Sequence, residues 1–131
     1  MCNNNNATEL FADGKIVFPG KEINAAKLPW YEHPAYKGVF MKDLVLGADT
    51  KGAFSCHVIL VKKGFEVGMH DHKAEWELNE VIEGTGYMVI DGKKVACRPG
   101  LSYVTPPEIS HDVSAPNEDM IMTAKFVPAL R

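Results

Sequence analysis

Short hydrophobic runs follow one another along most of the chain, some of them alternating with polar residues, and glycines and prolines separate them. This pattern predicts strands, because no long stretch shows a helical period after the first dozen residues. We expect strands over residues 14–18, 39–46, 53–61, 81–90, 93–97, 101–105 and 120–127. Short strands at this spacing are typical of a sandwich or a barrel, so the predicted class is all-β.

The residues between these runs predict how the strands connect. Asp91-Gly92 suits a tight type I′ hairpin, because glycine accepts a positive φ. Residues 28–34 contain two prolines, which favour an edge strand or a loop that crosses apolar surface. Residues 47–52 are expected to form a loop, and residues 1–8, which are rich in asparagine, a flexible tail.

Composition narrows the class of protein. The 131 residues are expected to form a single domain, 1–131, and 46% hydrophobic with 24% charged residues is typical of a folded globular chain. A net charge of -3 with scattered lysines argues against a nucleic-acid surface. No apolar stretch approaches the roughly 20 residues that span a bilayer, and the first residues do not resemble a secretory signal. We therefore expect a cytoplasmic protein without a membrane partner, whose three cysteines are reduced thiols.

A cluster of potential metal ligands stands out. His70 and His72 are one residue apart, so on a strand both imidazoles would point to the same face. A carboxylate such as Glu77 and the distant His111 would complete a site. Glu77 lies five residues after His72, so a turn between them must reset the alternation, after which Glu77 and Asn79 would both face inward.

The spacing of these residues resembles the cupin superfamily. From Gly64 to Gly84 the chain reads glycine, five residues, histidine, one residue, histidine, four residues, glutamate, six residues, glycine, which is similar to the first cupin motif. Gly100 to His111 is similar to the second motif, except that Glu108 stands where the family has glycine and Ala115 where it often has asparagine. The resemblance covers about residues 53–127 and implies a double-stranded β-helix, the jelly-roll barrel, with a metal inside.

The ligand set that the resemblance implies is His70, His72, Glu77 and His111, with Glu75 as the rival carboxylate for Glu77. Nitrogen and oxygen donors of this kind accept iron, manganese, nickel, cobalt, copper or zinc, one divalent ion per chain, so the residues do not identify the metal. Two coordination positions would stay open on an ion that prefers six. Such an ion keeps about one positive charge beside one glutamate, which favours small anionic or oxygen-chelating ligands.

Candidate catalytic residues outside the ligand set are weaker. His57 could line the pocket as an acid or base, but a core histidine with its hydrogen bonds satisfied is the favoured interpretation. Tyr87 and Tyr103 could donate a proton to a bound substrate, and core packing is the favoured alternative for both.

Three functions remain open from the sequence, because the fold does not choose among them. The first is an enzyme: a dioxygenase, or a metal-dependent isomerase or decarboxylase. The second is a module that senses or binds a small molecule without catalysis, and the third is a structural barrel in which metal only adds stability. Residues 14–18 could add a strand to a neighbouring copy, which predicts a homodimer.

Overall fold

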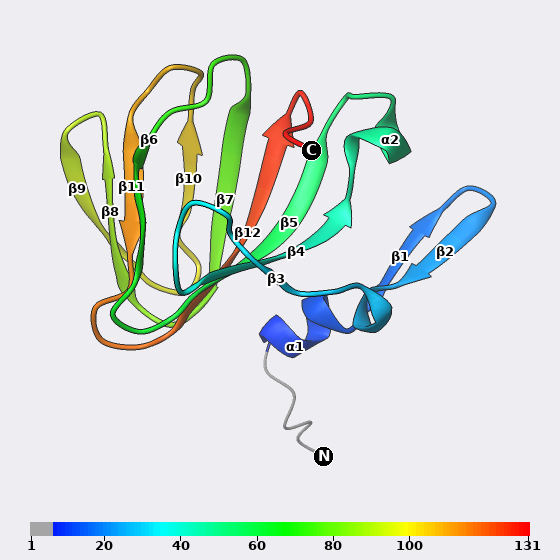
Figure 1. The fold of residues 1–131 in the computed structure, drawn as a ribbon, viewed down its shortest axis with the longest axis horizontal. Helices are drawn as coiled ribbons and strands as arrows, with labels where there is room; N and C mark the ends of the chain where they lie inside the picture. The colour runs from blue at the N-terminus through cyan, green and yellow to red at the C-terminus, as the bar shows by residue number, and fades with distance from the viewer. Residues whose placement is uncertain (1–6) are drawn as a thin grey trace.

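Two antiparallel sheets form the body of the protein, and a small N-terminal layer packs against one of them (Figure 1). The computed structural model describes residues 7–131. One sheet has six strands in the order β10-β7-β12-β5-β4-β3, and the other has four in the order β6-β11-β8-β9. The elements are α1 (Ala7–Ala12), β1 (Lys15–Phe18), β2 (Lys21–Asn24), η1 (Ala25–Lys27), β3 (Tyr31–Glu32), β4 (Val39–Val45), α2 (Gly47–Thr50), β5 (Ser55–Val61), β6 (Glu66–His70), β7 (Trp76–Glu83), β8 (Gly86–Ile90), β9 (Lys93–Cys97), β10 (Ser102–Thr105), β11 (His111–Ser114) and β12 (Met120–Val127).

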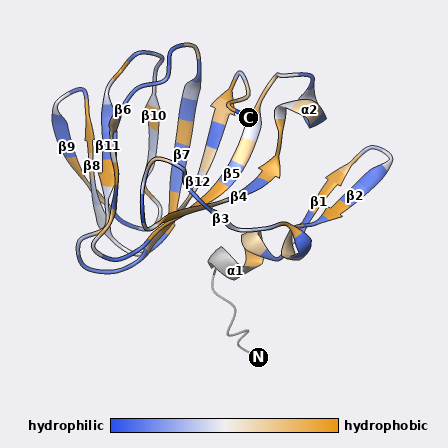
Figure 2. Ribbon diagram, in the orientation of Figure 1, coloured by the Kyte–Doolittle hydropathy of each residue, from blue (hydrophilic) through white to orange (hydrophobic). Residues whose placement is uncertain are grey.

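The main core lies between the two sheets. Val61 and Val81 from the six-stranded sheet belong to the same buried cluster as Met88 and Val113 from the four-stranded sheet. On β7 the same alternation buries two polar residues, Glu77 and Asn79, in place of apolar ones. Figure 2 shows hydrophilic and hydrophobic bands along β7. A polar pair inside an apolar barrel marks the functional part of the interior.

The predicted strands are largely confirmed, and so is the all-β class. Residues 120–127 form β12 with the expected bounds, and β3 is the edge strand expected from the proline-containing segment. Asp91 and Gly92 both have positive φ, 50° and 79°, between β8 and β9, as a type I′ turn requires. The barrel sheet also begins earlier than residue 53, because β4 pairs with β5 along its length.

The prediction of one strand over residues 81–90 was wrong. The chain forms β7 up to Glu83 and then β8 from Gly86, and the two strands belong to different sheets. Gly84 makes the crossing possible: its φ is 81°, and a Cβ atom there would lie 2.0 Å from the Asp119 carbonyl oxygen. The segment 47–52 was expected to be a loop, but it contains the short helix α2.

The N-terminal segment covers the outer face of the six-stranded sheet. Ala25 from η1 packs with Leu44, Val58 and Ile121 in a second buried cluster. Lys42 on β4 is 2% exposed, and its Nζ donates 2.8 Å hydrogen bonds to the carbonyls of Ala12, the last residue of α1, and Ala25, the first residue of η1. Residues 7 and 8 of the predicted tail lie in α1, and residues 1–6 fall outside the described residues. Within residues 7–131, no helix is long and apolar enough to cross a membrane.

Candidate metal centre

Three segments bring the four predicted ligands together. His70 ends β6 and His111 begins β11, and the two are direct partners in the antiparallel pairing of these strands. Their rings therefore lie side by side, with centroids 4.2 Å apart. His72 follows β6 and Glu77 is the second residue of β7. One ligand atom from each of the four residues lies within 4.8 Å of the others, a group that could hold a metal ion.

The route by which His72 enters this group differs from the prediction. β6 ends at His70, so His72 lies beyond the strand and not on its face. A bend at residues 73 and 74 then leads into β7, on which Glu77, Asn79 and Val81 are buried as expected. Glu75 precedes β7 and does not belong to the four-residue group.

Backbone carbonyls fix the orientation of two of the imidazoles. His70 Nδ1 lies 2.7 Å from the Gly68 carbonyl oxygen, and His111 Nδ1 lies 2.9 Å from the Ile109 carbonyl oxygen. A carbonyl only accepts hydrogen bonds, so each Nδ1 carries a hydrogen, and in the neutral ring each Nε2 then presents a lone pair. Burial lowers the pKa of His70 below its ordinary value of 6.5, which favours the neutral, metal-binding form. Outer hydrogen bonds of this kind commonly orient metal-binding histidines.

Asn79 orients the carboxylate of Glu77. Its amide nitrogen donates a 2.7 Å hydrogen bond to Glu77 Oε2, while Glu77 Oε1 lies 3.2 Å from both His72 Nε2 and His111 Nε2. Burial alone would raise the pKa of Glu77, but the imidazoles of His111 and His72 and the Asn79 amide outweigh it and lower the pKa to about 2. Burial likewise opposes a proton on His111, yet Glu77 and the Ile109 carbonyl raise its pKa above 6.5.

Unpaired polar atoms show that a cation fits this group. Within residues 7–131, five buried side-chain nitrogen and oxygen atoms lack a hydrogen-bond partner, and three of them are His72 Nε2, Glu77 Oε1 and His111 Nε2. The other two belong to Asn79, which holds Glu77, and to Thr105, the cross-strand partner of Glu77. Leaving buried polar atoms unpaired costs about 1–3 kcal/mol each, and a divalent cation would satisfy the three facing atoms at once.

A small, mostly apolar cavity adjoins the centre. Its volume is about 60 Å³, and its lining is formed by His33, Val39, Met41, Ile59, Val67, His70, His72, Glu77, Tyr103, His111, Asp112, Val113, Met122, Phe126 and Leu130. Phe126 contacts His72 edge to face, with ring centroids 5.1 Å apart. A cavity of this size holds a few water molecules or one small chemical group.

The three catalytic candidates occupy different places. Tyr103 lines the cavity, its hydroxyl lies 3.5 Å from Met122 Sδ, and burial followed by the Glu77 charge raises its pKa well above 10. His57 is fully buried outside the cavity, where Nδ1 lies 2.7 Å from Asp43 and Nε2 lies 2.9 Å from Ser55 Oγ. Tyr87 is 38% exposed and contacts Lys94, away from the centre. The structure therefore brings only Tyr103 to the four ligands.

Sequence reasoning missed two features of the site. Asn79 was expected to face inward, and its position two residues after Glu77 on the same strand face could have suggested that it holds the carboxylate. Leu130 reaches the cavity from beyond the last strand, and no periodicity in the sequence indicates this contact.

Comparison with known proteins supports the family assignment. A predicted oxalate decarboxylase from Thermotoga maritima is similar at 24% identity and a TM-score of 0.71, and the match covers 79% of this chain and 95% of that chain. An RmlC-like cupin from Shewanella frigidimarina is similar at 23% identity and a TM-score of 0.71, over 81% of this chain and 88% of that chain. An ectoine synthase from P. lautus is similar at 32% identity and a TM-score of 0.64, over 72% of this chain and 67% of that chain. No curated protein matches the sequence. The cupin domain family matches residues 57–125, more than half of the chain, and this protein belongs to the cupin family.

Proposed function

We propose that this protein is a metal-dependent enzyme that binds a small oxygen-chelating anion at His70, His72, Glu77 and His111. The observation that carries the proposal is the group of three buried, unpaired atoms that face one another at this centre. A divalent ion held by three neutral imidazoles and one carboxylate keeps about one positive charge, which attracts an anionic ligand. When bound, the metal would supply Lewis-acid polarisation of a ligand oxygen, and a redox-active metal would also supply oxygen chemistry.

The protein's own residues favour a hydrogen bond to a bound ligand. Tyr103 lines the cavity, and its hydroxyl stays protonated at neutral pH because burial raises its pKa well above 10. It is therefore placed to donate a hydrogen bond, and not a proton, to a ligand beside the metal ligands. Val67, Val113 and Met122 contribute apolar side chains to the same cavity. A hydrogen bond that stabilises negative charge on a ligand oxygen supports a non-oxidative reaction, such as decarboxylation, isomerisation or elimination, on a small hydroxy or keto acid.

A dioxygenase is the second candidate. The apolar lining and the volume of about 60 Å³ suit dioxygen, which needs little room and no hydrogen-bond donors. The similarity to an ectoine synthase at 32% identity supports the first candidate, because that protein is named for a synthase reaction. Turnover without oxygen uptake would identify the first, and oxygen uptake that depends on the substrate would identify the second. Tight binding without turnover in either assay would indicate a sensing module.

Metal content tests the centre itself. We expect close to one transition metal ion per chain in protein purified without an affinity tag, and at least tenfold weaker metal binding in His70→Ala and His111→Ala. Glu77→Gln should also lose metal, whereas Glu75→Gln is the matched control and should keep it, because Glu75 lies outside the four-residue group. A protein that stays metal-free after growth with excess metals would overturn the proposal, as would normal metal content in both histidine variants.

We also propose a homodimer. The β1–β2 hairpin extends away from the barrel (Figure 1), and Val17 on β1 is 68% exposed. Within residues 7–131, each of its two strands pairs only with the other, so each keeps an edge that could accept a strand from a second copy. Light scattering at micromolar concentration should give twice the chain mass, and the mass of a single chain would contradict the proposal.

A further inference from the structure

A second, larger pocket lies directly outside the metal centre. Its volume is about 430 Å³, and it is lined by His33, Ala35, Tyr36, His70, His72, Leu130 and Arg131. His70 and His72 are thus shared between this outer pocket and the inner cavity. The inner cavity takes only a small group, so the rest of any molecule that chelates a metal there must extend into the outer pocket.

The charge of the outer pocket is set by Arg131. The lining contains a guanidinium group and no aspartate or glutamate side chain. Within residues 7–131, Arg131 forms no ion pair with a carboxylate, and its guanidinium carbon lies 5.4 Å from the centroid of the Tyr31 ring. Burial is the main cause that lowers the pKa of His33. The positive charge of Arg131 lowers this pKa further, so the charge lies close to His33 in the lining of the outer pocket. A guanidinium held against a ring keeps its N–H donors available for a carboxylate.

A chain of partly buried hydrogen bonds holds the segment that carries this arginine. The Leu130 N–H donates to Ser55 Oγ at 3.0 Å, and the Ser55 hydroxyl lies 2.9 Å from His57 Nε2. His57 Nδ1 and the Tyr31 hydroxyl each lie 2.7 Å from Asp43 Oδ1, so this carboxylate anchors the chain. Since Ser55 and His57 are fully buried, the end of the segment is fixed from the sheet and not from solvent.

The residue after Leu130 is held as well. The backbone N–H of Gly47 donates a 2.6 Å hydrogen bond to the carbonyl of Arg131. The backbone at 130 and 131 is therefore fixed from both β5 and the start of α2. An arginine on a fixed backbone loses less freedom when it binds an anion than one on a mobile tail.

We infer that Arg131 is a second anchor for the substrate and binds a carboxylate at the end of the molecule opposite to its metal-chelating end. The substrate class is therefore a hydroxy or keto acid with a second, distal carboxylate. This inference rests on the proposed function, because the first anchor is the metal held at the four-residue centre. Arg131 selects the substrate in this scheme and takes no part in the hydrogen bond assigned to Tyr103.

Two hydroxy acids distinguish binding at the metal alone from binding at both the metal and Arg131. Glycolate has only a chelating end, whereas malate has the same end and a second carboxylate. With zinc-loaded protein in a calorimetric titration, we expect malate to bind at least about tenfold more tightly than glycolate, the size of effect that a charge-assisted hydrogen bond produces. In Arg131→Gln this preference should disappear while glycolate binding stays unchanged.

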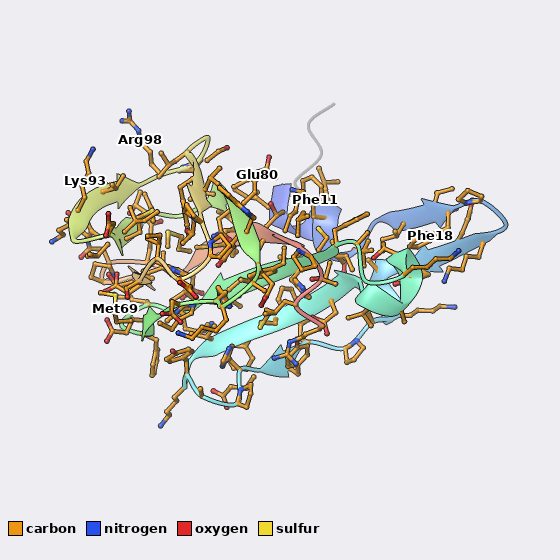
Figure 3. The ribbon with its side chains drawn as sticks, turned by 90° about the horizontal axis from the view of Figure 1, so that it is seen from above. Phe11, Phe18, Met69, Glu80, Lys93 and Arg98 are labelled. Carbon is orange, nitrogen blue, oxygen red and sulfur yellow. The ribbon has the colours of Figure 1, made fainter. Side chains whose placement is uncertain are left out.

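Arg98→Gln is the matched control, because it makes the same change of charge elsewhere on the molecule. Figure 3 shows Arg98 pointing away from the barrel, so this variant should keep the preference for malate. Equal affinities for the two acids in the unmodified protein would overturn the inference and leave the proposed function intact. So would loss of the preference in both arginine variants. Failure of the zinc-loaded protein to bind either acid would overturn the inference and the proposed function together. Equal thermal midpoints of the three proteins would confirm that each variant is folded.

Discussion

Replacing Glu77 with glutamine tests the electrostatics of the centre with little change of shape. In the metal-free protein the pKa of Glu77 is lowered from 4.5 to about 2. A carboxyl whose pKa is lower in the folded state stabilises the fold above its unfolded pKa and loses this contribution as the pH falls toward its folded pKa. Each pH unit below 4.5 removes about 1.4 kcal/mol, so roughly 2 kcal/mol of stability is lost by pH 3. Glutamine does not titrate, and Glu77→Gln lacks this loss.

The assay is urea unfolding of metal-free protein at pH 5 and pH 3. Starting at pH 5 leaves out most of the histidine titration, whose ordinary pKa is about 6.5. Between these two values, the unmodified protein should lose about 2 kcal/mol more free energy of unfolding than Glu77→Gln. Other carboxylates contribute equally to both proteins and cancel in the comparison. Glu75→Gln should follow the unmodified protein. An equal loss in Glu77→Gln and the unmodified protein would refute the charge arrangement described for the centre.

Three further predictions concern the fold and are all measured by urea unfolding. Gly84→Ala should lower the free energy of unfolding by about 3 kcal/mol or more, because its Cβ would lie 2.0 Å from the Asp119 carbonyl oxygen. Gly92→Ala is the control: its Cβ meets open space, so it should lose only about 1–2 kcal/mol for the left-handed backbone. Lys42→Met should cost about 1–3 kcal/mol, because the Ala12 carbonyl loses its bond from Nζ, whereas the Ala25 carbonyl keeps its bond from the Leu28 N–H; a neutral result would contradict the buried contacts. His57→Leu should cost about 1–3 kcal/mol, because it removes a hydrogen-bond donor from the Asp43 carboxylate and the acceptor of the Ser55 hydroxyl. Its metal content should stay unchanged, and a fall would instead place His57 in the metal centre.

The strands were predictable because their causes are local. The period of two in residues 120–127 and the positive φ that Asp91-Gly92 accepts depend on neighbours in the sequence, and both predictions are confirmed. The change of sheet at Gly84 was not predictable in this way. It depends on a carbonyl at residue 119, which the chain reaches only after four further strands.

The same distinction applies to the site. The resemblance of two segments to the cupin motifs was enough to predict that His70, His72, Glu77 and His111 meet, although they lie at β6, β7 and β11. Neither the chain of partly buried hydrogen bonds through His57 nor the position of Arg131 follows from spacing. Both arise where β4, β5 and the segment after β12 come together in the folded protein.

Glu108 shows why a departure from a family pattern can leave a site intact. The family has glycine at this position, and Glu108 has a φ of 66°, the left-handed conformation of a tight turn that glycine would supply. Its backbone N–H donates a 2.7 Å hydrogen bond to the carbonyl of His72, which joins the two segments that carry His72 and His111. Ala115 behaves similarly, because its backbone N–H and carbonyl bond to Phe65 and Gly64 at 3.1 and 2.7 Å. The turn and the strand contact are properties of the backbone, so the pattern of ligands survives although the residues at 108 and 115 differ.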